Sequence, residues 1–171
     1  MGTDFSLGKA AEYMGGEWAG ALRREEPSHD VQLSPFFLSK FELTQAQWLR
    51  LVRSNPSQLS PGDDGTTLLH PVESVSWDHC TEALRVWGLE LPTEAQWERA
   101  ARGATRTLWY TGDDPLGLQG QANLADATLL RDGSEHPMAS DKLDDGYAKH
   151  APVGRFRANP FGFHDVYGNV W

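Results

Sequence analysis

The chain has 171 residues, of which 39% are apolar and seven each are Trp and Phe, enough for the core of one domain. Its 15 Lys and Arg against 24 Asp and Glu give a formal net charge of -9, which repels a nucleic acid backbone or an anionic membrane surface. We therefore expect neither nucleic acid nor a membrane as a partner. No apolar run approaches the ~20 residues of a membrane helix and no secretory leader is visible, which favours a cytoplasmic location.

The cysteine and histidine content limits the metal and nucleophile chemistry. Cys80 is the one cysteine, so an internal disulfide is excluded and a cysteine-based metal site would need other ligands. The six histidines lack the His-x-x-His and His-Glu-x-x-His spacings, so a histidine metal site is not predicted. The sequence also lacks a phosphate-binding glycine loop and a Gly-x-Ser-x-Gly elbow.

The N-terminal part divides into a lead-in and two extended segments. Residues 1–30 combine a glycine pair with a charged run, which predicts a loosely structured lead-in. Residues 31–34 alternate apolar and polar side chains, and residues 36–43 are rich in aromatic residues. Both patterns favour β-strands that contribute to a sheet, so we expect the domain to span residues 31–171.

Three helices are predicted in the middle of the chain, each after a residue whose hydroxyl can cap it. Thr44 and Gln47 form a capping-box pattern before a helix from about residue 45 to 52. A second helix after Ser76 has an apolar stripe that includes Cys80 and is expected to end at Gly88. The third begins after Thr93, buries Trp97, Ala100 and Ala101, and stops at Gly103.

The remainder, residues 108–171, has no helical periodicity. Glycine, proline, Asn and Asp recur every few residues between single aromatic side chains. Such composition predicts irregular structure, and a long irregular region within one domain is usually functional or held by ions and side-chain contacts.

Five sequence blocks, in this order, resemble the formylglycine-generating-enzyme (sulfatase-modifying-factor) family. They are residues 36–48 followed by Asn55-Pro56-Ser57, residues 70–77 (HPVESVSW), residues 91–103 (LPTEAQWERAARG), residues 151–154 (APVG) and residues 159–171 (NPFGFHDVYGNVW). A single Leu-Pro-Thr-Glu would be a weak match, whereas five ordered blocks are a specific one. We interpret the chain as the first two-thirds of such a domain, incomplete at the C-terminus.

The resemblance implies a fold and a reaction. The fold is α+β and C-type-lectin-like, with few regular elements and long loops, and it is often steadied by calcium. Family enzymes use molecular oxygen to oxidise a cysteine of a sulfatase peptide or protein to formylglycine, with copper held by two cysteines. Those catalytic cysteines would lie beyond Trp171, so we expect this chain to bind no copper and to be inactive alone.

The resemblance also implies two calcium sites, both in loops. Asn123, Leu124, Asp145 and Tyr147 match the first, with Leu124 and Tyr147 contributing backbone oxygens. The second comprises Asp165, Gly168 and Val170, and its next family ligand is a glutamate directly after the position of Trp171. Calcium prefers such oxygen ligands, although Asn and Asp in loops more often cap turns.

Tryptophans divide between a groove and the core in this interpretation. The family's substrate groove is lined partly by residues 169–171, so Trp171 is the candidate for substrate binding, with burial in the core as the alternative. Trp77, Trp87 and Trp97 lie on apolar helical stripes and are predicted to pack inside.

Two other functions stay open. One is a non-catalytic lectin-like module that binds a ligand or a protein through its loops, because a fold does not determine a function. A downstream reading frame without cysteines would favour it. The other is a domain related to sulfoxide synthases, although those carry an additional N-terminal iron-binding domain with clustered histidines.

Overall fold

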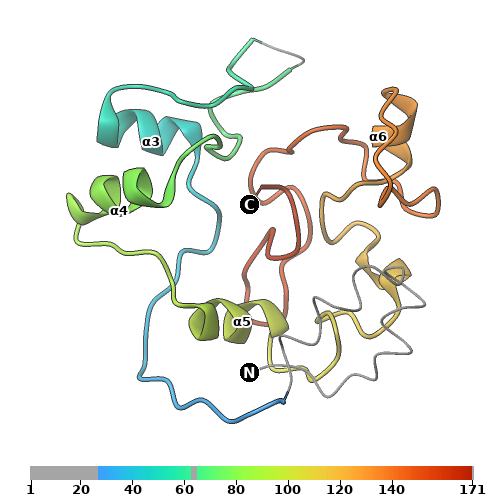
Figure 1. Ribbon diagram of the computed structural model, residues 1–171, viewed down its shortest axis with the longest axis horizontal. Helices are drawn as coiled ribbons and strands as arrows, with labels where there is room; N and C mark the ends of the chain where they lie inside the picture. Colours follow the sequence, from blue (N-terminus) through green and yellow to red (C-terminus); the bar gives the residue numbers. More distant parts are fainter. Residues whose placement is uncertain (1–26, 63–64, 171) are drawn as a thin grey trace.

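The computed structural model describes residues 27–62 and 65–170, in which short helices surround a centre made of irregular segments (Figure 1). The helices, in chain order, are α3 (Gln45–Val52), α4 (Trp77–Arg85), α5 (Glu94–Arg102), the 3-10 helix η2 (Pro115–Leu118) and α6 (Ala127–Arg131). Within the described ranges there is no β-strand, and isolated bridges join Thr44 to Pro71, Trp109 to Gly112, and Asp126 to Ser140.

The predicted helix starts are confirmed. Thr44 and Thr93 each accept a hydrogen bond from the backbone N–H three residues later, and Gln47 and Gln96 bond back to the cap residues. The third helix also ends as predicted, at Gly103 with φ 56. The second ends at Arg85 rather than at Gly88, because the chain tightens into a turn there.

The predicted strands over residues 31–34 and 36–43 are wrong. A strand needs a neighbour along its whole length, and this segment instead makes separate bonds to distant loops. The carbonyl of Leu43 accepts from Val72 N at 2.9 Å and that of Lys40 accepts from His164 N at 3.1 Å. The aromatic residues follow the same irregular path, and the Phe41 ring lies 4.8 Å from the imidazole of His164.

The prediction for the tryptophans is also wrong, since Trp77, Trp87 and Trp97 are 69%, 49% and 46% exposed. An apolar stripe predicts which way a helix face points, but not how much of that face is covered. In α5, Ala100 and Ala101 near the C-terminal end are buried as predicted, whereas Trp97, one turn earlier, is exposed. Cys80 lies on the buried side of α4, as predicted, against a cluster of Trp48, Val72 and Ala83.

The C-terminal segment, residues 150–170, crosses the centre of the molecule and connects its parts (Figure 1). Asn159 is buried and donates to Ala100 O at 2.6 Å, while its own amide oxygen accepts from Phe161 N and Phe163 N. Gly103 lies so close to Pro160 that an added Cβ would be 2.8 Å from the proline ring. The irregular structure predicted from residue 108 onward is therefore held by side chains rather than by a sheet, interrupted only by η2 and α6, which were not predicted.

Candidate functional site

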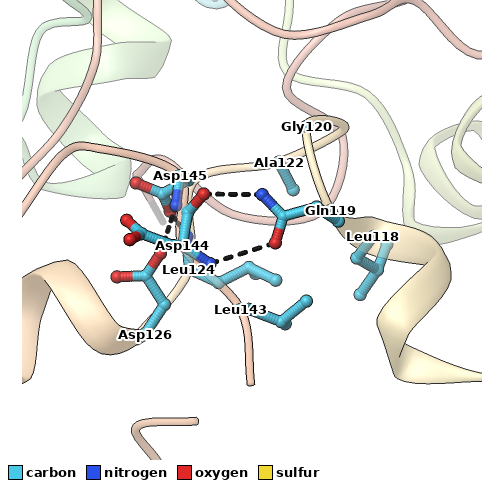
Figure 2. Close-up of a pocket in the computed structure, with 9 residues that line it drawn as sticks. All are labelled: Leu118, Gln119, Gly120, Ala122, Leu124, Asp126, Leu143, Asp144 and Asp145. Carbon is cyan, nitrogen blue, oxygen red and sulfur yellow. Dashed lines mark hydrogen bonds between the residues drawn. The ribbon is translucent and has the colours of Figure 1, made fainter. Parts of the chain in front are cut away.

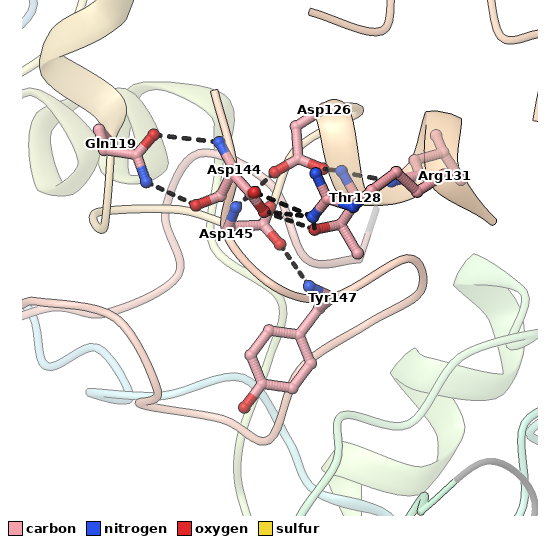
Figure 3. A network of polar contacts seen from close by, with 8 residues as sticks. Gln119, Asp126, Thr128, Arg131, Asp144, Asp145 and Tyr147 are labelled. Atoms are coloured by element: carbon pink, nitrogen blue, oxygen red, sulfur yellow. Dashed lines mark hydrogen bonds and ion pairs between the residues drawn. The ribbon is translucent and has the colours of Figure 1, made fainter. Parts of the chain in front are cut away.

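The four residues predicted as the first calcium site are brought together by hydrogen bonds. One carboxylate oxygen of Asp145 accepts from Leu124 N at 2.7 Å and the other from Tyr147 N at 2.8 Å (Figures 2 and 3). Asn123 is buried, and its side-chain nitrogen donates to Lys149 O at 2.6 Å. The amide nitrogen of Asn123 is thus occupied, which leaves its side-chain oxygen for another partner.

These four residues carry a carboxylate, a side-chain amide oxygen and the backbone carbonyls of Leu124 and Tyr147, and oxygen donors of these kinds are the ones that calcium prefers. The pKa of Asp145 is raised to about 6, chiefly by burial and also by the neighbouring charge of Asp126, although the hydrogen bonds from Leu124 and Tyr147 lower it. A cation beside Asp145 would relieve the cost of that buried charge.

Asp126 lies next to this group and was not predicted as a site residue. Its side chain is fully buried, with 0% of its surface exposed. One carboxylate oxygen caps α6 by accepting from Thr128 N at 2.8 Å and Leu129 N at 3.3 Å, and the other accepts from Asp145 N (Figure 3). The position of an Asp just before a short helical run is the sequence signal that identifies its capping role.

The residues predicted as the second calcium site lie against the first. Asp165 is only 6% exposed, has φ 57, and accepts from Gly154 N through Oδ2 at 2.6 Å. Its other oxygen, Oδ1, is buried and has no hydrogen-bond donor among the described residues. Gly168 approaches the carbonyl of Asn123 so closely that an added Cβ would lie 2.1 Å from that oxygen. The two predicted sites are therefore neighbours.

Glu42 joins the second group, although sequence reasoning passed over it. Asn169 Nδ2 donates to its carboxylate at 2.6 Å. The pKa of Glu42 is raised to about 8, chiefly by burial and also by the charge of Asp165, although bonds from the Asn169 side chain and the Val170 backbone lower it. The position of this acidic residue within the aromatic run 36–43 was the one sequence pattern that could have indicated its burial.

A second unexpected pair consists of two buried histidines. The rings of His70 and His150 lie 5.1 Å apart, tilted by 54°. His70 Nδ1 accepts from Thr67 N at 3.0 Å, whereas neither ring nitrogen of His150 has a partner in the described part of the chain. Burial lowers the pKa of both imidazoles, and each is held neutral at physiological pH.

The remaining candidates add little. Cys80 is partly buried, and burial raises the pKa of its thiol. Trp171, the predicted substrate-binding residue, lies outside the described residues. Across residues 27–62 and 65–170, no three His, Cys, Asp or Glu side chains gather as metal ligands, which leaves open a site built from amide and backbone oxygens. No helix in this part is long and apolar enough to cross a membrane.

Comparison with known proteins extends these observations. The sequence model described as "Sulfatase-modifying factor enzyme 1-like domain" matches residues 3–171, which includes the predicted lead-in. The formylglycine-generating enzyme of Thermomonospora curvata is 38% identical over 105 residues, which are 60% of this chain and 32% of that protein. The inactive C-alpha-formylglycine-generating enzyme 2 of Bos taurus is also 38% identical, over 59% of this chain and 31% of that protein.

Among solved structures, Treponema denticola variable protein 1 resembles this chain with a TM-score of 0.54 and 22% sequence identity. The likeness covers 75% of this chain and 58% of that one, and at this identity it supports the fold alone. The chain spans about a third of the length of the two curated relatives above.

Proposed function

The chain belongs to the family of sulfatase-modifying factor enzyme 1-like domains, and from this premise we propose that it serves formylglycine generation. In that reaction a cysteine of a sulfatase-type peptide or protein is oxidised to formylglycine with molecular oxygen. The match over residues 3–171 carries the proposal, and the five ordered motif blocks support it. A C-type-lectin-like arrangement is part of the proposal, and the few helices and long loops are compatible with it.

Copper bound by two thiolates would activate oxygen in this chemistry, and the residues of this chain do not fit such a centre. Cys80 is the one cysteine, and it packs against Trp48, Val72 and Ala83 in the core. We therefore propose that these 171 residues contribute the scaffold and part of the peptide groove, including Trp171, while the copper ligands come from elsewhere.

Calcium is the cation that the acidic loops are proposed to hold. The oxygen-only set of Asn123, Leu124, Asp145 and Tyr147 supports a first site. For the second, Asp165 supplies a buried carboxylate oxygen that has no donor among the described residues, and Gly168 and Val170 would contribute backbone oxygens. A buried, unpaired carboxylate oxygen is costly, so a cation there is favourable.

The test uses the whole chain with a fluorescent Cys-x-Pro-x-Arg peptide and a scrambled peptide as the control. We expect selective binding by anisotropy, and no aldehyde product by mass spectrometry when copper and oxygen are supplied. Equal binding of both peptides would contradict the proposed substrate. It would favour the alternative of a non-catalytic binding module. Aldehyde formation would contradict the assignment of the copper ligands.

A further inference from the structure

The two halves of the proposed calcium site lie at the two ends of one loop. We call residues 126–144 the α6 loop; Asn123 and Leu124 lead into it, and Asp145 and Tyr147 follow it. Backbone bonds close its neck, from Ala127 N to Leu143 O at 3.0 Å and from Ser140 N to Ala125 O at 2.9 Å. The geometry of the neck therefore determines how far apart the two halves lie.

Asp126 is the buried side chain at this neck, and α6 alone does not account for its burial. An ordinary N-cap residue satisfies the first turn of its helix and needs no burial to do so. None of the five residues of α6 is buried, yet Asp126 is fully enclosed. Its second carboxylate oxygen accepts from Asp145 N, 19 residues along the chain (Figure 3).

The other contacts across the neck are more exposed. Thr128 Oγ1 donates to Asp144 Oδ1 at 2.6 Å, and Arg131 pairs with Asp144 at 2.9 Å. The side chains of that ion pair are 61% and 51% exposed, and exposed pairs typically contribute about 0–1 kcal/mol. Gln119 brackets the backbone of Asp144 through both its amide atoms (Figure 2). Asp144 is thus held at the surface, whereas Asp126 holds Asp145 from inside.

We propose that Asp126 is the positioning residue of this cation site and that it couples calcium binding to closure of the α6 loop. By accepting from Asp145 N, Asp126 fixes the backbone from which the Asp145 carboxylate and the Tyr147 carbonyl project. Calcium that binds the assembled ligands stabilises the closed neck, and the closed neck in turn strengthens calcium binding, because linkage is reciprocal. The inference rests on the proposed calcium site.

Two variants separate this role from capping. In Asp126→Asn the amide oxygen still caps α6, but the amide nitrogen is a donor and cannot accept from Asp145 N. In Asp126→Ser the hydroxyl also caps well but is too short to bridge both partners. The matched control is Asp144→Asn, which removes the same charge from the neighbouring surface residue.

The first measurement is calcium titration of the whole chain by calorimetry, with melting curves to establish that each variant is folded. Removing a residue that orients metal ligands typically weakens affinity about 10–100-fold, which we expect for Asp126→Asn and Asp126→Ser. Asp144→Asn is expected to bind within about threefold of the original chain, because salt screens exposed charges.

The second measurement is hydrogen exchange of residues 127–143 with and without calcium. Calcium should slow exchange throughout the α6 loop of the original chain and have little effect in the two Asp126 variants. Equal affinities for the original chain and both Asp126 variants would overturn the inference, as would an equal loss in Asp144→Asn. Absence of calcium binding by the original chain would instead refute the proposed site itself, and the coupling with it.

Discussion

Two acidic clusters lie side by side in this molecule, and they are built differently. In the Asp126 cluster, Asp126 and Asp145, all four carboxylate oxygens accept from backbone N–H groups. In the Glu42 cluster, Glu42 and Asp165, the Asn169 side chain and the Val170 backbone bond to Glu42, whereas Asp165 Oδ1 has no donor in the described part of the chain. Every carboxylate oxygen of the first cluster therefore has a donor, whereas the second cluster keeps one carboxylate oxygen without a donor.

The two clusters also differ in the pKa of their carboxyl groups. Burial raises the pKa of Asp145 to about 6 and that of Glu42 to about 8. Burial is the largest cause of both pKa shifts, and Glu42 is the more deeply buried of the two, so its pKa rises more. The largest consequences for stability should come from removing an acid in the first cluster and from ionising one in the second.

The largest expected effect is that of Asp126→Ala. The change leaves three partly buried N–H groups without their acceptor, and each costs up to roughly 1–3 kcal/mol, so the free energy of unfolding should fall by about 3–5 kcal/mol. Urea denaturation at pH 7 measures it. A loss below about 1 kcal/mol, within the range of an ordinary surface substitution, would contradict the structural role of this cluster.

The next effect is the pH dependence contributed by Glu42. Its pKa is raised on folding, so the folded protein keeps a proton that the unfolded chain has already lost between about pH 4.5 and 8. Stability from this group is fully present below pH 4.5 and is lost as the pH rises, by about 2–4 kcal/mol.

Denaturation of Glu42→Gln in the presence of a calcium chelator should remove that decline. The exposed Glu90→Gln is the control, and it should leave the pH profile unchanged. A decline that persists in Glu42→Gln would assign the titration to another group.

A smaller and opposite effect is expected at the buried histidines. Burial lowers the pKa of His150, which lies beside His70; the charge of Lys149 lowers this pKa too, whereas the charge of Glu73 raises it. The stabilising contribution of His150 is therefore present above about pH 6.5 and is lost as the pH falls. His150→Leu should therefore reduce the loss of stability between pH 7 and 5. Thermal melts at both pH values measure it, with the exposed His79→Gln as the control; identical profiles for the two variants would refute it.

The smallest effect is predicted for Asp165→Asn without calcium. The amide oxygen can still accept from Gly154 N, Asn tolerates the φ of 57, and an uncharged NH2 group replaces the unpaired carboxylate oxygen. The free energy of unfolding should change by less than about 1 kcal/mol. A loss comparable with that of Asp126→Ala, measured in the same way, would show that the two clusters do not differ.

Features that depend on residues close together in the sequence were predicted, whereas features that depend on contacts between distant residues were not. Helix starts at Thr44 and Thr93 were predicted because a cap involves residues three apart, and the residues of the first calcium set were named through the family motif. The prediction of strands in residues 31–43 was wrong because the pairing of β-strands depends on segments that are distant in the sequence. Asp126, Glu42 and His150 were not predicted as site residues because their burial and their contacts with distant residues arise only in the folded chain.

The sequence by itself determined the family and the capped helices, since these depend on short spacings and ordered motifs. Tertiary structure alone decided which carboxylates are enclosed and which find donors. Asp126 and Asp144 are the same residue type in the same loop region. In the structure, however, Asp126 is fully buried with its oxygens paired, whereas Asp144 is exposed beside Arg131. The cost of a buried charge depends on the surrounding donors, and those come from segments far apart in the chain.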